Sequence, residues 1–486
     1  MGSGTVSFSQ SPWKEHLTPF PHRFSHRFSL RICDGRTQSQ WRHSSHGLFP
    51  CREPFNCFAC ARKSTYTTHM PSSVTAPEGQ IRRRDKFRAY MQAFNPTAAA
   101  RDVIEAGLVF DDLHQSLYRN LASRADLEPG GQQLLVGGVG SGKTTELILA
   151  ERWLKDHGHV LPLYIDTSAE TDLSSLNSGA LLASLGLHLG EQLSGIFSAG
   201  TLTDEVKERA NQAHVRIKEY AYGKKELVQS GESMKMVEGY DDFLAKRVGV
   251  REIPGKLKAP LPVLNRDIQE IRVPLKLLLN IVRATHKDVV AIFDGLDRLL
   301  DPTKFWSVVH QDLRILRELR VSVIATAPLS VLFGVGVGQT ISDHFDRVHH
   351  LTVIASEPAN VLLRSVLEKR SASSLLHPEI AGSICDYSGG VLRDLISLAR
   401  DAAEEAYVSD RDHISVADIE KVAHQLGNGY LRGLGPEAIN TLLQLDRLGS
   451  FDVSQPANVE LLATRRVVEY SSIDFRVHPA LLSVIP

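Results

Sequence analysis

The feature of this 486-residue sequence that most constrains its fold is a glycine-rich run, Gly-Gly-Val-Gly-Ser-Gly-Lys-Thr, at positions 137–144. It follows an apolar segment expected to form a strand, and it precedes a helical pattern that runs to Leu154. Glycines let the backbone curl so that successive N–H groups face one anion, and the helix N-terminus adds partial positive charge. The pattern therefore predicts a phosphate-binding loop between a strand and a helix, known as a P-loop.

The side chains of this loop have distinct predicted roles. Lys143 should reach the β- and γ-phosphates of a nucleotide, Thr144 should offer its hydroxyl to Mg²⁺, and Thr145 should lie near the α-phosphate. The expected cofactors are ATP and Mg²⁺, since the Asn-Lys-x-Asp run typical of GTPases is absent. The predicted nucleotide site consists of Gly137, Gly138, Val139, Gly140, Ser141, Gly142, Lys143, Thr144 and Thr145.

An acidic residue ends a later apolar segment. Residues 288–294 read Asp-Val-Val-Ala-Ile-Phe-Asp, so Asp294 stands where a carboxylate can hold magnesium, a Walker B arrangement. Asp297, three residues on, is close enough to orient or deprotonate an attacking water. The structural alternatives are a strand-end cap for Asp294 and a surface ion pair of Asp297 with Arg298.

Two further polar residues stand at positions that can read the γ-phosphate. Thr326 follows the apolar segment 321–325, and Arg393 lies at the start of a later helical pattern. The planar, permanently charged fork of an arginine can grip phosphate oxygens and report their loss. The alternatives are a plain strand end and an exposed helical arginine. The predicted catalytic residues are Lys143, Asp294, Asp297, Thr326 and Arg393, and the predicted magnesium ligands are Thr144 and Asp294.

The order of apolar segments predicts the fold class. From residue 132 to about 353, strand-like segments alternate with helical ones, which is typical of a parallel sheet with crossover helices. The expected strands are Gln132–Val136, Val160–Asp166, Val289–Asp294, Val321–Ala325 and Val348–Ile354. Helical patterns follow at 358–368, 378–387, 391–407, 416–426 and 436–445, and short strands at 467–470 and 474–477. The sequence predicts an α/β P-loop NTPase sheet with a helical lid and a C-terminal winged-helix-like domain.

We expect five regions along the chain. They are a leader at 1–69, N-terminal helices at 70–130, an ATPase core at 131–356 with a helical insertion at 198–262, the lid at 357–427, and the winged-helix-like domain at 428–486. The N-terminal helices, one from Asp85 and one from Pro96 to Leu117, either flank the nucleotide base or simply pack. The mixed charge of the insertion is typical of a solvated helical face, with a partner-binding arm as the alternative.

Residues 1–69 show no helical or strand period, so we expect no packed core there. A disordered leader and an organellar transit peptide are alternatives to the interpretation that we favour, translated upstream sequence with the start at Met70. Four of the five cysteines fall in this region. Cys57 and Cys60 form a CxxC pair, but no second pair follows, so we do not expect a zinc site.

The net charge of −1 gives no global reason for binding to nucleic acid or to an anionic membrane. No apolar run approaches the roughly 20 residues that a bilayer crossing requires. We therefore expect a cytoplasmic protein without a membrane partner.

Two motifs carry a resemblance to known families. Phe293-Asp294-Gly295-Leu296-Asp297 resembles the Walker B motif of STAND ATPases, particularly NACHT modules, and the run from Ser388 to Asp394 resembles the sensor 2 region of initiator-type AAA+ proteins. The resemblance implies a bacterial ATPase with Arg393 near the γ-phosphate. Gly295 stands where orthodox AAA+ proteins place Glu, and Arg298 stands where NACHT modules tend to carry an acid. The resemblance therefore implies slow hydrolysis.

Two functions follow as hypotheses. The preferred one is an ATP-operated conformational switch that controls self-assembly or an unidentified protein effector, with bacterial conflict or defence as the setting that the resemblance implies. The alternative is a DNA-associated initiator or loader that uses its winged helix. The expected recognition helix at 456–464 carries Glu460 and gains positive charge only at Arg465 and Arg466, so DNA is not favoured. The arginine-finger candidates are Arg298, Arg317, Arg320 and Arg347.

Overall fold

The structure is a computed structural model that describes residues 78–109, 116–198, 203–222, 267–285, 288–299, 301–333, 337–354, 360–371 and 375–485. The predictions for the leader, for Cys57 and Cys60, and for most of the insertion lie outside these residues.

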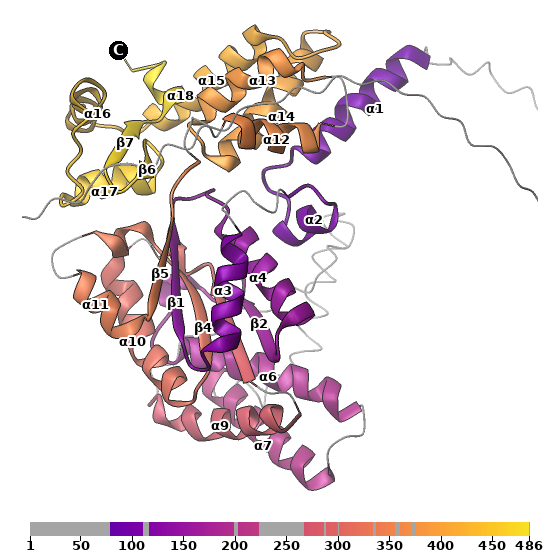
Figure 1. The fold of residues 1–486 in the computed structure, drawn as a ribbon, viewed down its shortest axis with the longest axis vertical. Coiled ribbons are helices and arrows are strands. Elements are labelled where there is room, and N and C mark those ends of the chain that lie inside the picture. The colour runs from indigo at the N-terminus through magenta and orange to yellow at the C-terminus, as the bar shows by residue number, and fades with distance from the viewer. Residues whose placement is uncertain are drawn as a thin grey trace, which may run out of the picture. The chain divides into compact units, whose positions relative to one another are not determined.

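A five-stranded parallel sheet occupies the centre of the region predicted as the ATPase core (Figure 1). Its strands are β1 (Gln132–Gly137), β2 (Val160–Asp166), β3 (Asp288–Asp294), β4 (Ser322–Ala327) and β5 (Arg347–Leu351), in the spatial order β2-β3-β4-β1-β5. All four neighbouring pairs are parallel, so every strand ends at the same edge of the sheet. The predicted α/β class is confirmed. The predicted end of the last strand at Ile354 is wrong, because pairing with β1 ends at Leu351.

Helices cover both faces of the sheet, which explains why its strands are apolar on both sides. On one face, α3 (Leu117–Leu127) and α4 (Lys143–His157) share a core with Val290 and Ile292 of β3. On the other face, Val289 and Phe293 pack in the core that holds α6 (Ala180–Ser198), α9 (Gln269–Thr285) and α10 (Pro302–Glu318). Asp294 is the last residue of β3 and therefore lies at the edge where the strands end.

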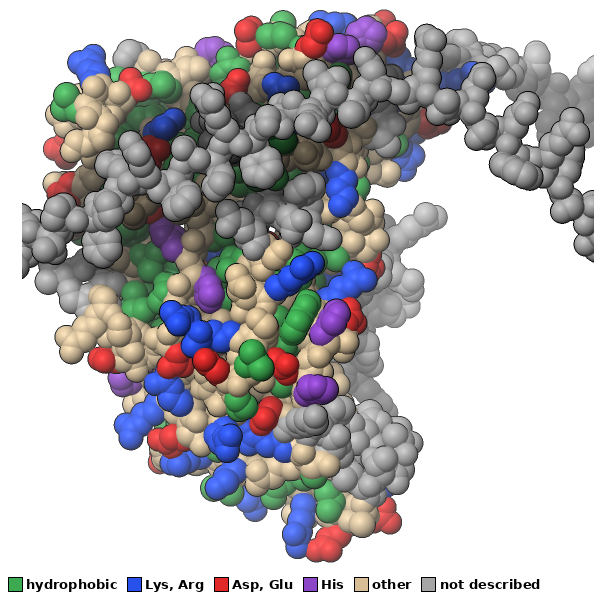
Figure 2. Space-filling model, viewed as in Figure 1, with side chains coloured by type: hydrophobic (Ala, Val, Ile, Leu, Met, Phe, Trp, Pro, Cys, Tyr) green, Lys and Arg blue, Asp and Glu red, His purple; other side chains and the backbone are tan. Residues whose placement is uncertain are grey.

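The described part of the insertion is α7 (Asp204–Tyr222), which packs against α6 and α9. It buries Ala210, Ala213, Ile217 and Tyr220. Its charged residues occupy the remaining surface, as the mixed charge predicts. Over the sheet-containing region in Figure 2, basic and acidic side chains are interspersed, without one continuous basic patch on that face.

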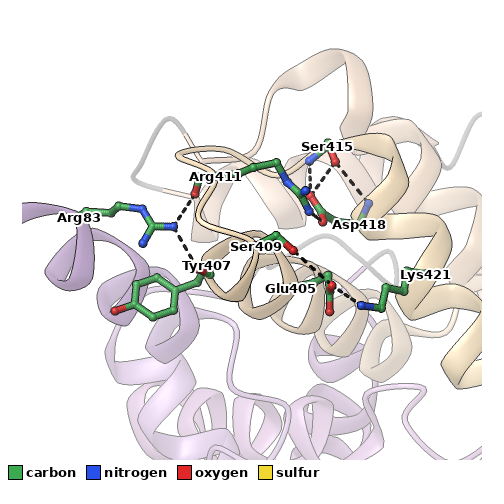
Figure 3. Close-up of polar contacts among 8 residues, drawn as sticks. All are labelled: Arg83, Glu405, Tyr407, Ser409, Arg411, Ser415, Asp418 and Lys421. Carbon is green, nitrogen blue, oxygen red and sulfur yellow. Dashed lines mark hydrogen bonds and ion pairs between the residues drawn. The ribbon is translucent and has the colours of Figure 1, made fainter. Parts of the chain in front are cut away.

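The lid comprises α12 (Asn360–Arg370), α13 (Pro378–Ser388), α14 (Leu392–Val408) and α15 (Val416–Leu431). The N-terminal helix α1 (Glu78–Ala93) buries Phe87 and Tyr90 in the core of these helices. Arg83 fixes it there by donating hydrogen bonds to the backbone carbonyls of Tyr407 (3.1 Å) and Arg411 (2.8 Å) (Figure 3). Of the two interpretations of this helix, packing is therefore the one that its contacts support.

The prediction of one second N-terminal helix from Pro96 to Leu117 is wrong. The structure has instead α2 (Ala100–Glu105), a left-handed Gly107 with φ +68°, and a separate α3 that begins at Leu117. The left-handed glycine ends the helical path, which the apolar spacing alone did not reveal. Helix α2 lies on α4, where Arg101 pairs with Glu151 at 2.6 Å.

The C-terminal region contains α16 (Pro436–Leu448), α17 (Pro456–Ala463), the hairpin of β6 (Val467–Ser471) and β7 (Asp474–Val477), and a final short helix, α18 (Pro479–Leu482). The order of helices and hairpin agrees with the expectation, while α18 was not predicted. Shorter elements include α5 (Thr167–Glu170), α11 (Val337–His344), and the 3₁₀ turns η2 (Leu296–Arg298) and η3 (Leu329–Leu332). Among the described helices, none combines the length and the apolar character needed to span a bilayer.

Candidate functional site

The glycine-rich run forms a tight loop between β1 and α4. Gly140 and Gly142 adopt φ +82° and +101°, and α4 begins immediately afterwards at Lys143. A Cβ on Gly137 would lie 2.6 Å from the carbonyl oxygen of Leu351, so only glycine fits against β5. The expected strand, loop and helix are all present, and the first N–H groups of α4 face the loop.

Lys143 uses all three of its donors inside the protein. Its ammonium group, on a side chain that is 5% exposed, lies 2.9 Å from the carbonyl oxygens of Gly137 and Gly138 and 2.9 Å from a carboxylate oxygen of Asp297. An ammonium has three donors, so a phosphate can be bound only if one of these contacts is given up. The two carbonyls belong to the loop itself, which leaves Asp297 as the contact to be exchanged.

Asp294 receives several hydrogen bonds at the end of β3. It accepts from the hydroxyl of Tyr164 (2.7 Å), from the backbone N–H of Gly295 (2.7 Å) and from the hydroxyl of Thr144. Burial raises the pKa of Asp294, and the nearby charge of Asp297 raises it further, although the hydrogen bonds offset part of the shift. A carboxylate in such surroundings is stabilised by a cation.

The structure therefore joins the two predicted magnesium ligands, Thr144 and Asp294, across the first turn of α4 and the end of β3. Sequence reasoning missed Tyr164, which lies on β2 beside β3. Its signal was weak, since a tyrosine near the end of an apolar strand is usually a packing residue.

Thr326 lies on β4, between the strands that lead to the P-loop and to Asp294. Its side chain is fully buried and its hydroxyl accepts a hydrogen bond from the backbone N–H of Leu296 at 3.1 Å. This contact fixes the turn that carries Asp297. In this arrangement Thr326 positions Asp297, and a direct contact with a γ-phosphate stays a prediction.

The backbone conformation and the surroundings of Gly295 favour glycine at this position. Its φ is +83°, and an added Cβ would lie 2.8 Å from the side chain of Ser168 on α5. The backbone of this turn therefore excludes a glutamate at this position. Gly295 is therefore suited to this turn, where β3 meets α5.

Arg393 stands in the first turn of α14, directly against the P-loop. A Cβ built on Gly140 would approach the Cβ of Arg393 to 2.7 Å. Burial lowers the pKa of Arg393, the neighbouring charge of Arg465 lowers it further, and the nearby Asp394 and Asp297 act in the opposite direction. Arg393 is thus an exposed arginine beside the loop, and its contact with a γ-phosphate stays a prediction.

The C-terminal region also reaches the P-loop, which the sequence did not reveal. Leu462, Arg465 and residues 467–469 line a cavity of about 20 Å³ together with Gly138 and Ser141. The contact is held by a backbone hydrogen bond from Val353 to Glu469 (3.0 Å) and by the pair of His350 with Glu469 (3.1 Å). Such a cavity has room for about one water molecule, far less than a phosphate chain needs.

A buried polar cluster joins the lid to the C-terminal region. Asp394 accepts hydrogen bonds from the hydroxyl of Tyr430 (2.5 Å) and from the guanidinium of Arg465 (2.6 Å), and Nε2 of His478 lies 3.3 Å from it. Burial would raise the pKa of Asp394, but His478 and Arg465 outweigh it and hold the pKa below its usual range. Asp394 is therefore an anchored carboxylate one residue from Arg393.

The four arginine-finger candidates separate into two groups. Arg298 lies at the carboxyl edge of the sheet, in the turn after β3, near Arg393. Arg317 and Arg320 precede β4, and Arg347 begins β5, so all three lie at the opposite edge, where Arg317 pairs with Asp346 at 3.0 Å. These three can reach a nucleotide only in a neighbouring copy.

The residues present fit a nucleotide with magnesium. The loop offers backbone N–H groups and a buried ammonium, and Thr144 and Asp294 form the oxygen pair typical of a magnesium site beside phosphate. The parallel sheet, the P-loop between β1 and α4, and the acid at the end of β3 decide the fold class. The fold is that of a P-loop NTPase.

Comparisons with known proteins add only distant likenesses. No protein-family model matches this P-loop NTPase, and no curated protein matches it. It is similar to the Aeropyrum pernix ORC2 protein in its ADPNP–ADP complexes, with 14% identity and a TM-score of 0.37 over 76% of this chain and 91% of that chain. It is similar to Drosophila ORC bound to DNA, with 12% identity and a TM-score of 0.37 over 83% of each chain. The A. pernix ORC1 protein in complex with DNA shows 17% identity and a TM-score of 0.36 over 75% of this chain and 83% of that chain.

Proposed function

We propose that this chain binds ATP with Mg²⁺, hydrolyses it slowly, and uses the nucleotide state to move its C-terminal region. The observation that carries the proposal is the position of residues 462–469 over one side of the P-loop, where only about 20 Å³ is left. A cavity of this size does not hold a phosphate group, so we expect this segment to move if phosphates contact that side of the loop. Nucleotide binding and the position of the C-terminal region are then one coupled equilibrium.

Binding begins with an exchange of partners at Lys143. Phosphate oxygens replace the carboxylate of Asp297, because the other two contacts of Lys143 belong to the loop. Thr144 and Asp294 hold the magnesium ion, which neutralises phosphate charge when it is bound. The exchange releases Asp297, on a turn held by Thr326, to accept a proton from water or to orient it.

Slow hydrolysis follows from the same turn. The position after Asp294 excludes a side chain, so the water must be activated from Asp297, three residues on. Arg393 supplies positive charge from the lid, as the resemblance to sensor 2 implies. Hydrolysis then requires one state in which the lid is closed, the phosphates are bound and Asp297 is released. Because this state forms rarely, turnover is slow.

The test uses the contact between β5 and β6 in which His350 pairs with Glu469. Glu469→Gln weakens the pair with His350, so Mg-ATP should associate about 3- to 10-fold faster in stopped-flow measurements. His377→Gln is the control, since His377 is exposed on the lid and remote from this contact. Absence of nucleotide binding to the wild-type chain would refute the nucleotide function. Equal association rates in all three proteins would refute the coupling.

DNA association is the second candidate. The solved structures named above are of ORC proteins, two of them with DNA, and not of STAND or NACHT proteins. The specific observation in its favour is a cavity of about 400 Å³ between α1 and α14, whose lining includes Arg84, Arg88 and Arg400 and no carboxylate. Guanidinium groups are suited to phosphate contacts. Helix α17, the recognition helix that the DNA alternative requires, packs against η3 and buries Val459 and Leu461.

This second candidate is tested with a duplex oligonucleotide at two salt concentrations. If DNA is bound through α1, Arg84→Gln with Arg88→Gln should lower the affinity and the salt slope, while Arg476→Gln on the hairpin should not. Loss of binding only with Arg476→Gln would place the DNA on the hairpin instead. Neither a conflict or defence setting nor an effector protein finds support among the described residues, so neither is part of the proposal.

A further inference from the structure

Arg465 lies in the short connection between α17 and β6, where it lines the small cavity over the P-loop with Gly138 and Ser141. We propose that Arg465 binds the phosphate chain of the nucleotide, as a second arginine beside Arg393, and thereby links the C-terminal region to nucleotide occupancy. This inference rests on the proposed function and assigns a residue to its regulation.

The guanidinium of Arg465 is held in place but not saturated. Nη1 donates to Asp394 at 2.6 Å, and the group lies 5.5 Å from the ring centre of Tyr430. Within the described ranges, Nε and Nη2 have no hydrogen-bond partner. A planar fork with one edge anchored and other donors open is suited to a phosphate.

The backbone of Arg465 ends helix α17 and fixes the point from which the side chain leaves the chain. Its φ is +65°, in the left-handed region that favours glycine or asparagine. A left-handed residue at this point is the common way to end a helix, in the pattern known as the Schellman motif. Here the hydrogen bonds that end α17 and the pair with Asp394 fix it: the backbone N–H groups of Arg465 and Arg466 donate to Leu462 and Leu461 at 3.0 and 2.9 Å.

The charges around this point favour an anion. Burial lowers the pKa of Arg393, and the nearby charge of Arg465 lowers it further. Of the nearby carboxylates, Asp394 already binds Tyr430 as well as Arg465, and Asp297 pairs with Lys143. Glu469, which lines the same cavity, pairs with His350. A phosphate would relieve the repulsion between the two arginines.

A phosphate that attracts Arg465 would weaken its pair with Asp394. Asp394 would then keep Tyr430 and His478, so the buried carboxylate would not be left without partners. The link between α14 and the C-terminal region would loosen at the residue next to Arg393. Occupancy of the P-loop would thus be transmitted by exchange of one ion pair.

The experiment measures the affinity of the full chain for inorganic pyrophosphate and for Mg-ADP by calorimetry. Arg465→Gln should weaken both by about tenfold, and Arg465→Lys, which retains the charge, should show an intermediate loss. Arg476→Gln is the matched control, because Arg476 lies on the neighbouring strand, is exposed and pairs with Asp474. Hydrogen exchange in β6 supplies a second measurement, and its response to Mg-ADP should be reduced in Arg465→Gln.

Wild-type affinities for both ligands, with a wild-type exchange response, in Arg465→Gln and Arg465→Lys would overturn the inference and leave Arg465 as a purely structural ion pair. The proposed function would stand in that case, provided that Lys143→Ala abolishes binding. If Lys143→Ala binds pyrophosphate normally, the P-loop assignment itself fails. Should Arg465→Gln unfold, as judged by its melting curve, Arg465→Lys alone decides between the two outcomes.

Discussion

The nucleotide site has two halves that are built differently. The sheet half consists of Lys143, Thr144, Asp294 and Asp297, which follow or end β1 and β3 at the carboxyl edge of the sheet and are joined by the pairs Lys143–Asp297 and Thr144–Asp294. The second half consists of Arg393, Asp394 and Arg465, which come from the lid and the C-terminal region and are joined by one buried cluster. The sheet half should bind nucleotide in any conformation, whereas the second half should respond to it.

The largest expected effect comes from removal of the ammonium group in the sheet half. Lys143→Ala should weaken ATP and ADP binding at least about 100-fold, roughly 3 kcal/mol, because the phosphates lose their buried cation. Lys155→Ala on the same helix is the control, since its exposed side chain pairs only with Glu151. Calorimetry measures both variants, and unchanged affinity in Lys143→Ala would remove the P-loop from the site.

Asp294→Asn should separate binding from hydrolysis. Phosphate release in the presence of Mg²⁺ should fall about 100-fold, while nucleotide affinity changes much less, because the carboxylate serves the metal. Asp288→Asn at the other end of the same strand is the control, and it should leave both quantities close to wild type. Wild-type turnover in Asp294→Asn would place the magnesium acid elsewhere.

Gly295→Ala tests the turn that joins β3 to Asp297. The positive φ and the 2.8 Å approach to Ser168 predict a loss of about 1–3 kcal/mol in the free energy of unfolding, measured by denaturant titration. Gly429→Ala in α15 is the control, because an added Cβ meets no atom within 4 Å there. Equal stability of the two variants would contradict the steric account of the missing glutamate.

The smallest effect on affinity is expected in the second half. Arg393→Ala should weaken ATP binding only about 3- to 10-fold, because the sheet half still holds the phosphates. It should nevertheless abolish the difference in lid hydrogen exchange between the ATP and ADP states. A variant that binds ATP as poorly as Lys143→Ala would show that the two halves are not distinct.

The comparison also explains what could be read from the sequence. The strands, the P-loop and Asp294 follow from local apolar patterns and a contiguous motif, so their positions were predictable. The pair of Lys143 with Asp297 joins residues 154 positions apart and depends on the strand order, which places β4 between β1 and β3. The interpretation of Asp297 as a partner of Arg298 could be corrected only by the folded arrangement.

The second half was less predictable because it has no contiguous motif. Arg465 looked like one of only two basic residues at the end of a predicted recognition helix, and His478 and Tyr430 carried no pattern at all. These residues become a cluster only in the folded chain, where they surround Asp394. His478 is fully buried there and Asp394 is 3% exposed. Tertiary polar clusters of this kind leave few traces in the spacing of residue types.

The most direct test of the account is hydrogen exchange in β6, residues 467–471, measured without nucleotide, with Mg-ADP and with Mg-ATP. If the C-terminal region yields to an occupied P-loop, exchange in β6 should rise on nucleotide binding in the wild-type chain. The same titration of Lys143→Ala should give no change. Identical exchange in β6 in all nucleotide states, at concentrations where calorimetry shows the site to be saturated, would contradict the central claim.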